Sequence, residues 1–183
     1  LMETAIRTVG ITGSSGSGVK PSAGTHHPVR VNNLKAYKPL NHQHRAEIVQ
    51  TLRLAGAGDI SLDFVPVSAP LGRGILAISQ LDMPKSQDLP DVHARYTDYY
   101  RHNPLVSVLP SGMSAEVVAV AGTARVEIAL DAKTDEDTGR RTLCCTTAID
   151  NLVKGGAGQA IQCFNLMTGK PVNAGFDKPG LWP

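Results

Sequence analysis

Two long strand-like segments, residues 124–132 and 140–149, constrain the fold more than any other feature of the sequence. The segment that joins them, DAKTDEDTGR, is acidic and carries turn-forming residues, so it predicts a solvated hairpin turn. A hairpin joins antiparallel strands. We therefore expect a sheet that is antiparallel at least in part.

The remaining pattern adds both strands and helices. Further strands are expected at 4–13, 32–38, 59–67, 74–82 and 105–109, and helices at 45–55, from about Pro90 to before Pro104, and at 151–168. Because strands outnumber helices and are joined by hairpins and helices alike, we predict an α+β domain with a mostly antiparallel or mixed sheet and helices packed on one face. The length of 183 residues predicts a single domain, 1–183.

Composition narrows the function classes. A net charge of +2 and 4% aromatic residues speak against nucleic-acid binding. No apolar run approaches the roughly 18 residues that a membrane span requires. Three cysteines, two of them adjacent, make no disulfide framework, so we expect a reduced, cytoplasmic protein.

The richest segment for chemistry is YKPLNHQHRAEI, residues 37–48. It places Tyr37, Lys38, His42, His44 and Glu47 at a strand-to-helix junction, and imidazoles suit general acid–base work near neutral pH. The competing interpretation is a polar surface cap with solvated histidines. Metal ligation by the two histidines and the glutamate is a further possibility, but the spacing matches no standard zinc motif, and we predict no metal.

Two glycine-rich segments are candidate ligand contacts. The loop at 13–28 offers backbone N–H groups around Gly16, Ser17 and Gly18 that suit an anion, although a flexible linker has the same composition. The expected last helix begins at Asn151 and carries glycines in its first turns, among them Gly155. Close approach of a ligand and tight helix packing both explain such glycines. The chain contains no dinucleotide-binding fingerprint of the Rossmann type.

Four segments in order, GTHHPVR, AYKPLNHQHRAEI, LGRGIL and TAIDNLVKGGAGQAIQCFNLMTGKPVNAGF, carry a family resemblance. Together they resemble the N-acetyl-gamma-glutamyl-phosphate reductases of arginine biosynthesis, and equally the aminoadipyl-phosphate reductases of carrier-protein lysine biosynthesis. The resemblance covers the C-terminal domain only. It implies the fold of the second domain of glyceraldehyde-phosphate and aspartate-semialdehyde dehydrogenases, and a homo-oligomer.

The family chemistry implies parts that this chain lacks. A cysteine thiolate attacks an acyl phosphate, a thioester forms, and NADPH delivers hydride to release an aldehyde. The resemblance places that cysteine, and the NADP-binding Rossmann domain, upstream of Leu1, while Cys144, Cys145 and Cys163 fall at non-catalytic positions. The resemblance also implies an acyl-phosphate substrate, which a carrier protein would present in the lysine branch.

The resemblance also assigns roles to single residues. His42 is the implied general acid–base, with His44 and Tyr37 orienting substrate or base. The implied cofactor contacts are Asn151, Gly16, Ser17, Gly18 and Gly155, and the implied phosphate or carboxylate contacts are Arg30, Lys38, Arg45 and Arg73. Family members usually read His-Arg-His where this chain has His42-Gln43-His44, which removes one cation.

A different class of function also fits the sequence. A stand-alone dimerisation or interaction module that kept the fold and lost the reaction would equally lack the nucleophile. The absent cysteine favours this alternative for the isolated chain, whereas the retained His42, His44 and Asn151 favour an enzyme for the parent protein.

Overall fold

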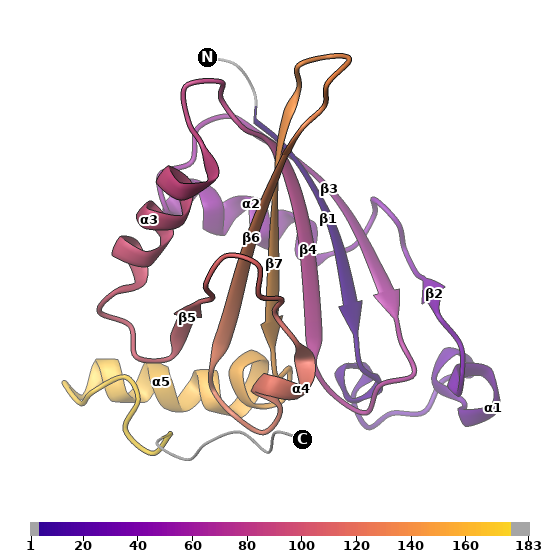
Figure 1. Ribbon diagram of the computed structural model, residues 1–183. Coiled ribbons are helices and arrows are strands. Elements are labelled where there is room, and N and C mark those ends of the chain that lie inside the picture. The colour runs from indigo at the N-terminus through magenta and orange to yellow at the C-terminus, as the bar shows by residue number, and fades with distance from the viewer. Residues whose placement is uncertain (1–3, 177–183) are drawn as a thin grey trace.

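The computed structural model describes residues 4–176. Its centre is a seven-stranded mixed sheet with the order β2-β3-β1-β4-β7-β6-β5, shown in Figure 1. The strands are β1 (Thr4–Thr12), β2 (Lys35–Ala36), β3 (Ile60–Ser68), β4 (Ile75–Asp82), β5 (Val106–Val108), β6 (Val126–Thr134) and β7 (Arg141–Ile149).

The helices are α1 (His27–Arg30), α2 (His44–Leu54), α3 (Leu89–Tyr100), α4 (Val117–Val120) and α5 (Gly158–Met167). Two 3₁₀ turns, Ser14–Ser17 and Ala23–Thr25, follow β1, and a π-helical turn, Val153–Ala157, precedes α5. Among the described residues, no helix is both long and apolar enough to span a bilayer.

The predicted hairpin is confirmed as β6 and β7, which pair antiparallel from Val126 opposite Ile149 to Thr134 opposite Arg141. Its turn is closed by Asp135, whose carboxylate accepts hydrogen bonds from the backbone N–H and the hydroxyl of Thr138. These bonds hold the pKa of Asp135 below its usual value. The sheet is mixed because β1 pairs parallel with β3 and antiparallel with β4.

Both long helices contact one face of the sheet, as predicted. The core beneath α3 is a cluster of buried apolar side chains from that helix, from β6 and β7, and from the residue that follows β4: Met83, Val92, Ile128, Leu130 and Leu143. Farther along the same face, the Arg45 guanidinium at the start of α2 donates through Nε to the carbonyl of Leu62 on β3 at 2.8 Å. In Figure 1, α2 lies behind the strands.

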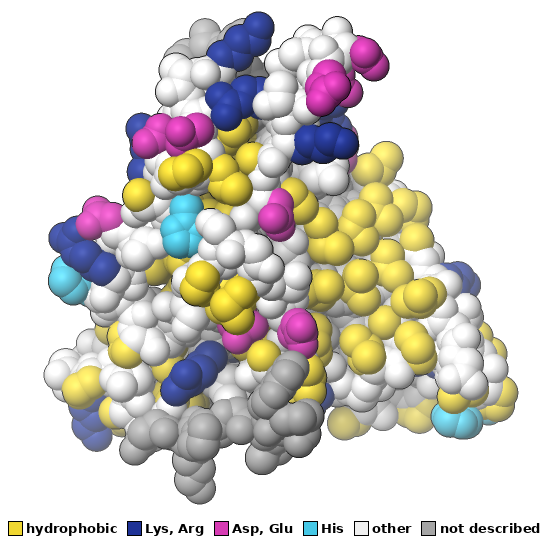
Figure 2. All heavy atoms as spheres, viewed as in Figure 1, with side chains coloured by type: hydrophobic (Ala, Val, Ile, Leu, Met, Phe, Trp, Pro, Cys, Tyr) yellow, Lys and Arg dark blue, Asp and Glu magenta, His cyan; other side chains and the backbone are white. Residues whose placement is uncertain are grey.

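The opposite face is covered only in part. The segment around α4 packs over one corner through a second buried cluster: Ala115, Val120, Ala129 and Ala148. The rest carries half-buried or exposed apolar side chains of β1, β3 and β4, and we call this surface the open face: Val9, Ile11, Val65, Val67 and Ile78. Figure 2 shows it as a continuous apolar area.

Two sequence predictions are corrected. The strand expected at 32–38 shrinks to Lys35–Ala36, because Asn32 and Lys38 adopt positive φ angles of 53° and 45°, which end a strand. The helix expected at 151–168 becomes a π-helical turn and a shorter α5, because Gly156 leaves helical geometry at φ −144° and ψ −113°.

Apolar residues recur at helical spacing along the last helix, but they do not form its buried side. Phe164 is 56% exposed and Met167 is 86% exposed, whereas the buried side chains of α5 are Gln162 and Asn165. Asn165 donates to the carbonyls of Val172 and Ala174, which fixes the chain after the helix. Helical spacing alone therefore identified a stripe but not the side on which it lies.

Candidate functional site

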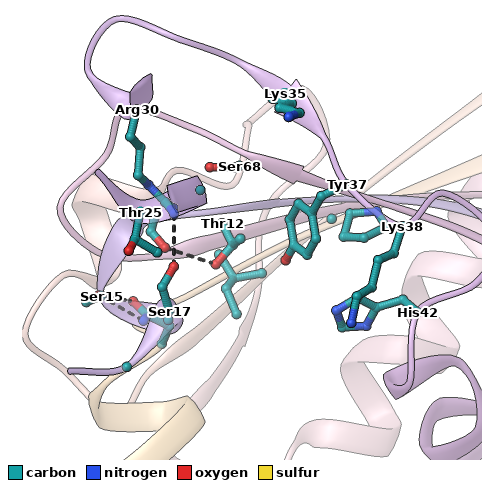
Figure 3. Close-up of a pocket in the computed structure, with 18 of the residues that line it drawn as sticks. Thr12, Ser15, Ser17, Thr25, Arg30, Lys35, Tyr37, Lys38, His42 and Ser68 are labelled. Atoms are coloured by element: carbon teal, nitrogen blue, oxygen red, sulfur yellow. Dashed lines mark hydrogen bonds between the residues drawn. The ribbon is translucent and has the colours of Figure 1, made fainter. Parts of the chain in front are cut away.

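A cavity of about 900 Å³ lies beside the end of β1. All but two of the predicted site residues line it: Gly16, Ser17, Gly18, Arg30, Tyr37, Lys38, His42, His44, Asn151 and Gly155. Figure 3 shows Tyr37, Lys38 and His42 on one side of it and Arg30 and Ser17 on the other. The structure thus brings together segments that are far apart in the sequence.

The floor beneath His42 is built by Gly10 and Phe64. A Cβ at Gly10 would lie 2.9 Å from the Phe64 ring, so only glycine at this point of β1 leaves room for that ring. The ring in turn meets His42 edge to face, with centroids 5.7 Å apart. The aromatic floor therefore depends on one residue type in the neighbouring strand.

The segment from Tyr37 to His42 holds its shape at an energetic cost. Lys38 and Leu40 both lie in the left-handed region, with φ angles of 45° and 61°, which costs on the order of 1–3 kcal/mol for each non-glycine residue. The backbone N–H groups of Tyr37 and Leu40 donate to the carbonyls of Pro66 and Phe64 on β3. These bonds pin the strained segment to the sheet and set the direction of Lys38 and His42.

His42 is the buried ionisable group of the cavity, with 9% of its surface exposed. Tyr37, His44 and Phe64 all contact its ring edge to face. Burial, followed by the charges of His44 and Lys38, lowers the pKa of His42 below its ordinary value of 6.5. A histidine with a lowered pKa is neutral at pH 7, which suits a group that exchanges protons or donates hydrogen bonds.

Tyr37 is a second uncharged polar group on the same side. Burial raises the pKa of its phenol, and the nearby charge of Arg30 opposes that rise. The phenol therefore keeps its proton throughout the physiological range and is available as a hydrogen-bond donor.

The other side of the cavity is cationic. Arg30 donates through Nη1 to the hydroxyl of Ser17 at 2.9 Å, and its Nε is buried without a hydrogen-bond partner among the described residues. Lys38 approaches from the opposite side, with its Nζ 3.4 Å from the Gln43 side-chain oxygen. A buried N–H without a partner is costly, and a bound carboxylate or phosphate oxygen would relieve that cost.

The backbone of the Ser14–Ser17 turn is less free than the sequence indicates. The N–H groups of Ser14 and Ser15 donate to the carbonyls of Leu71 and Gly72, and that of Gly16 donates to Gly13. The first two bonds hold the turn against the β3–β4 loop, and the third closes the turn itself. The groups of this turn that remain to contact an anion are the hydroxyls of Ser15 and Ser17 and the backbone N–H groups at the end of the turn.

Asn151 is held by the protein on two sides. Its side-chain oxygen accepts the N–H of Gly74 at 2.6 Å, and its amide nitrogen donates to the hydroxyl of Ser15 at 3.0 Å. The side chain is 9% exposed. One amide hydrogen is left for a ligand, and the residue also ties the Ser14–Ser17 turn to the β3–β4 loop.

The neighbouring Asp150 is fully buried and was missed by sequence reasoning. Its carboxylate accepts from the N–H groups of Leu152 and Val153 at 2.8 and 2.9 Å, which caps the π-helical turn. The other oxygen accepts from the N–H of Gly122 at 2.7 Å. The same oxygen lies 3.1 Å from Arg73 Nε. The two groups form an ion pair, but the Arg73 N–H is not aligned with the oxygen and makes no hydrogen bond to it.

Arg45 and Arg73 are the two predicted site residues outside the cavity lining. Arg73 pairs with Asp150, and Arg45 binds the Leu62 carbonyl. Both cations thus have partners within the protein, so we do not carry them into the proposed substrate site.

Metal ligation at the histidine pair finds no support in the geometry. Within residues 4–176, no three His, Cys, Asp or Glu side chains are grouped so as to hold a metal ion. His44 and Glu47 lie on the surface of α2 with their Nε2 and Oε2 atoms 3.9 Å apart. The cavity is also lined without a cysteine, so the described residues place no thiol at this site.

Comparison with known proteins identifies both the domain and its sequence relatives. A family model described as the semialdehyde dehydrogenase dimerisation domain matches residues 1–151. An N-acetyl-gamma-glutamyl-phosphate reductase of Methanosphaera stadtmanae is 38% identical over 173 residues, which is 94% of this chain and 49% of that protein. The same-named protein of Corynebacterium aurimucosum is 39% identical over 184 residues, 100% of this chain and 52% of that protein.

The chain therefore spans about half the length of the curated relatives that it matches. The predicted resemblance in sequence is confirmed. Among solved structures, aspartate semialdehyde dehydrogenase II of Vibrio cholerae superimposes with a TM-score of 0.67 at 14% identity. The match covers 90% of this chain and 55% of that one, and it confirms the predicted fold.

Proposed function

The chain belongs to the semialdehyde dehydrogenase dimerisation domain family, and from this premise we propose that it is the C-terminal half of an NADPH-dependent acyl-phosphate reductase. The substrate is an N-acylated glutamyl or aminoadipyl phosphate, and the product is its semialdehyde. The protein acts in the cytoplasm, in arginine or lysine biosynthesis. The other half supplies a Rossmann domain and the cysteine nucleophile.

One observation carries the proposal. The cavity combines a buried histidine of lowered pKa, His42, with the cations Arg30 and Lys38. Reduction of an acyl phosphate needs both features, because the substrate is anionic and because charge develops on the carbonyl oxygen as its carbon is attacked. The curated relatives that contain a matching half are named N-acetyl-gamma-glutamyl-phosphate reductases, and their substrate is an acyl phosphate.

The roles follow from the geometry. Arg30, with Ser17 beside it, holds a phosphate or carboxylate of the substrate, and Lys38 adds a second positive charge across the cavity. His42 faces the reacting oxygen as its proton or hydrogen-bond donor, and Tyr37 and His44 hold its ring. Bound NADPH supplies the hydride.

The cofactor fits these residues in part. The cavity wall at Gly18 is open, since a Cβ there would meet nothing within 4 Å, whereas a Cβ at Gly16 would lie 3.4 Å from the Thr12 hydroxyl. Asn151 has one amide hydrogen left to offer a carboxamide. Asn151, with Gly16 and Gly155 beside it, would hold the nicotinamide end, and the other half would bind the rest of the cofactor.

The proposal is tested by comparing the isolated chain with a completed one. Residues 1–183 alone should show no reductase activity and no strong affinity for NADP, because the adenosine and pyrophosphate contacts belong to the other half. The completed protein is a chimera in which these residues replace the matching half of the Methanosphaera stadtmanae reductase. It should oxidise NADPH when N-acetyl-gamma-glutamyl phosphate is added.

Isothermal titration and a coupled assay give the answers. Micromolar NADP binding to the isolated chain would refute the proposed division between two halves. A folded chimera that binds NADPH but reduces no acyl phosphate would favour the alternative, an inactive dimerisation module derived from the same fold.

We also propose that the chain forms a homodimer through its open face. Val9, 38% exposed, is flanked by Val65 on one side and by Ile78 on the other, and Ile11 continues the apolar area toward Val67. Contiguous apolar patches of more than a few hundred Å² usually mark an interface. Sedimentation should therefore show a dimer at tens of micromolar.

Val9→Asp should convert that dimer to a monomer, because a two-fold interface would bury the new carboxylate twice. The matched control is Val19→Asp, since Val19 is fully exposed in the loop after β1 and lies off the open face. A wild-type chain that sediments cleanly as a monomer would contradict the proposal. So would a Val9→Asp variant that stays dimeric.

A further inference from the structure

The backbone beside His42 determines which of its two ring nitrogens carries the proton. The N–H of His44 points at Nδ1 of His42, with 3.3 Å between the two nitrogens. A backbone N–H is always a donor, so Nδ1 must present its lone pair. A neutral imidazole carries one proton, and that proton is therefore on Nε2.

Nε2 is the nitrogen left for a ligand. It has no hydrogen-bond partner among residues 4–176, yet it is not sealed from solvent as the Arg30 Nε is. His42 lines the cavity, and the rings of Tyr37, Phe64 and His44 contact its own ring. The structure therefore offers a fixed N–H donor directed at the cavity from a ring that cannot turn freely.

We propose that the backbone amide of His44 locks His42 in the Nε2–H tautomer, so that His42 meets its substrate as a neutral hydrogen-bond donor. For the reaction, the inference rests on the proposed function: His42 donates to the carbonyl oxygen of the acyl group as negative charge develops there. The N–H bond stays intact in this step, and no proton is transferred. A neutral histidine polarises a substrate carbonyl in this way in triosephosphate isomerase.

The charged neighbours keep the ring neutral. Lys38 and His44 each disfavour a proton on Nδ1, in the same direction as burial, and only Glu47 on α2 opposes them. A protonated Nδ1 would also face the His44 N–H donor to donor. Neutral His42 with Nε2 as donor is then the resting state at pH 7, and Nε2 in that state cannot accept a proton from a thiol.

The test is a direct reading of the tautomer in residues 1–183 by long-range proton–nitrogen correlation NMR with ¹⁵N-labelled histidine. The six histidines are distinguished by the signal lost in His42→Gln. Above its pKa, the folded wild-type chain should show Nδ1 of His42 as an acceptor nitrogen and Nε2 as the protonated one. His44→Ala retains the backbone N–H and should retain this tautomer, while the pKa of His42 rises.

The chain unfolded in urea is the reference, because His42 should then show the same tautomer mixture as the other histidines. An Nδ1–H tautomer in the folded chain, or a His42 that is protonated at pH 7, would overturn the proposal. The measurement uses no substrate and no cofactor. Its failure is therefore distinguishable from the failure of the proposed function, which shows only in the chimera.

Discussion

Asp150→Ala is expected to lower the free energy of unfolding by about 3 kcal/mol or more, because it removes the acceptor of three backbone N–H groups and each unsatisfied donor costs about 1–3 kcal/mol. The carboxylate is fully buried and satisfies three backbone N–H groups besides facing Arg73. Alanine leaves those donors without acceptors. Since a domain is stable by roughly 5–15 kcal/mol in total, urea unfolding followed by circular dichroism should show a large shift of the midpoint.

Two variants separate this effect from a general loss of charge. Asp150→Asn retains one side-chain oxygen for Leu152 and Val153 and should cost less than alanine. Asp82→Ala removes a surface pair with Arg140, with 61% of the Asp82 side chain exposed, and should cost less than about 1 kcal/mol. Equal effects at positions 82 and 150 would contradict the organising role of Asp150.

Most of the fold was predictable because its signals are local. The hairpin turn, the alternating strands and the two long helices each depend on residues that are neighbours in the sequence. The structure places β6, β7, α2 and α3 close to the expected ranges. The strand order is not local. It depends on which strands share an edge, and no short segment encodes the parallel pairing of β1 with β3.

Part of the site was predictable for the same reason. Tyr37, Lys38, His42 and His44 lie in one short segment. So many ionisable side chains close together in the sequence are recognisable as a candidate site. Asp150 was missed because its partners Arg73 and Gly122 are distant in the sequence. Its structural role also depends on its burial, which the sequence does not show. Adjacency to Asn151 was the one available signal.

The buried side of the last helix could not be predicted from its pattern. Apolar residues at helical spacing normally mark the buried side, yet the α5 side chains that face the domain are Gln162 and Asn165. The family match ends at residue 151, before this helix begins. Periodicity indicates that two faces differ, and only the packing of neighbouring elements tells which one is inside.

Replacing His42 in the chimera should lower turnover far more than substrate affinity. Removing a donor to a developing oxyanion costs about a hundred- to a thousandfold in kcat, and loss of general acid–base catalysis costs a similar amount or more. His42→Asn, which leaves no donor at the Nε2 position, should therefore lower kcat at least a hundredfold with a modest change in KM. His44→Asn should be milder, since it keeps the backbone N–H.

Two controls sharpen this prediction. His42→Gln carries an amide N–H near the position of Nε2, so it should recover part of the activity if donation is the main role, and none if proton transfer is. Metal ligation predicts a different pattern: His42→Asn and His44→Asn would be equally damaging, and a chelator would abolish the activity of the unmutated chimera.

We propose that the reaction takes place in the cavity around His42, and the ratio of kcat values for the unmutated chimera and its His42→Asn variant tests this most directly. Steady-state NADPH oxidation with N-acetyl-gamma-glutamyl phosphate gives both values. We expect a ratio of at least about one hundred, with similar KM values. Small and equal effects from His42→Asn and His44→Asn in a folded, active chimera would contradict it.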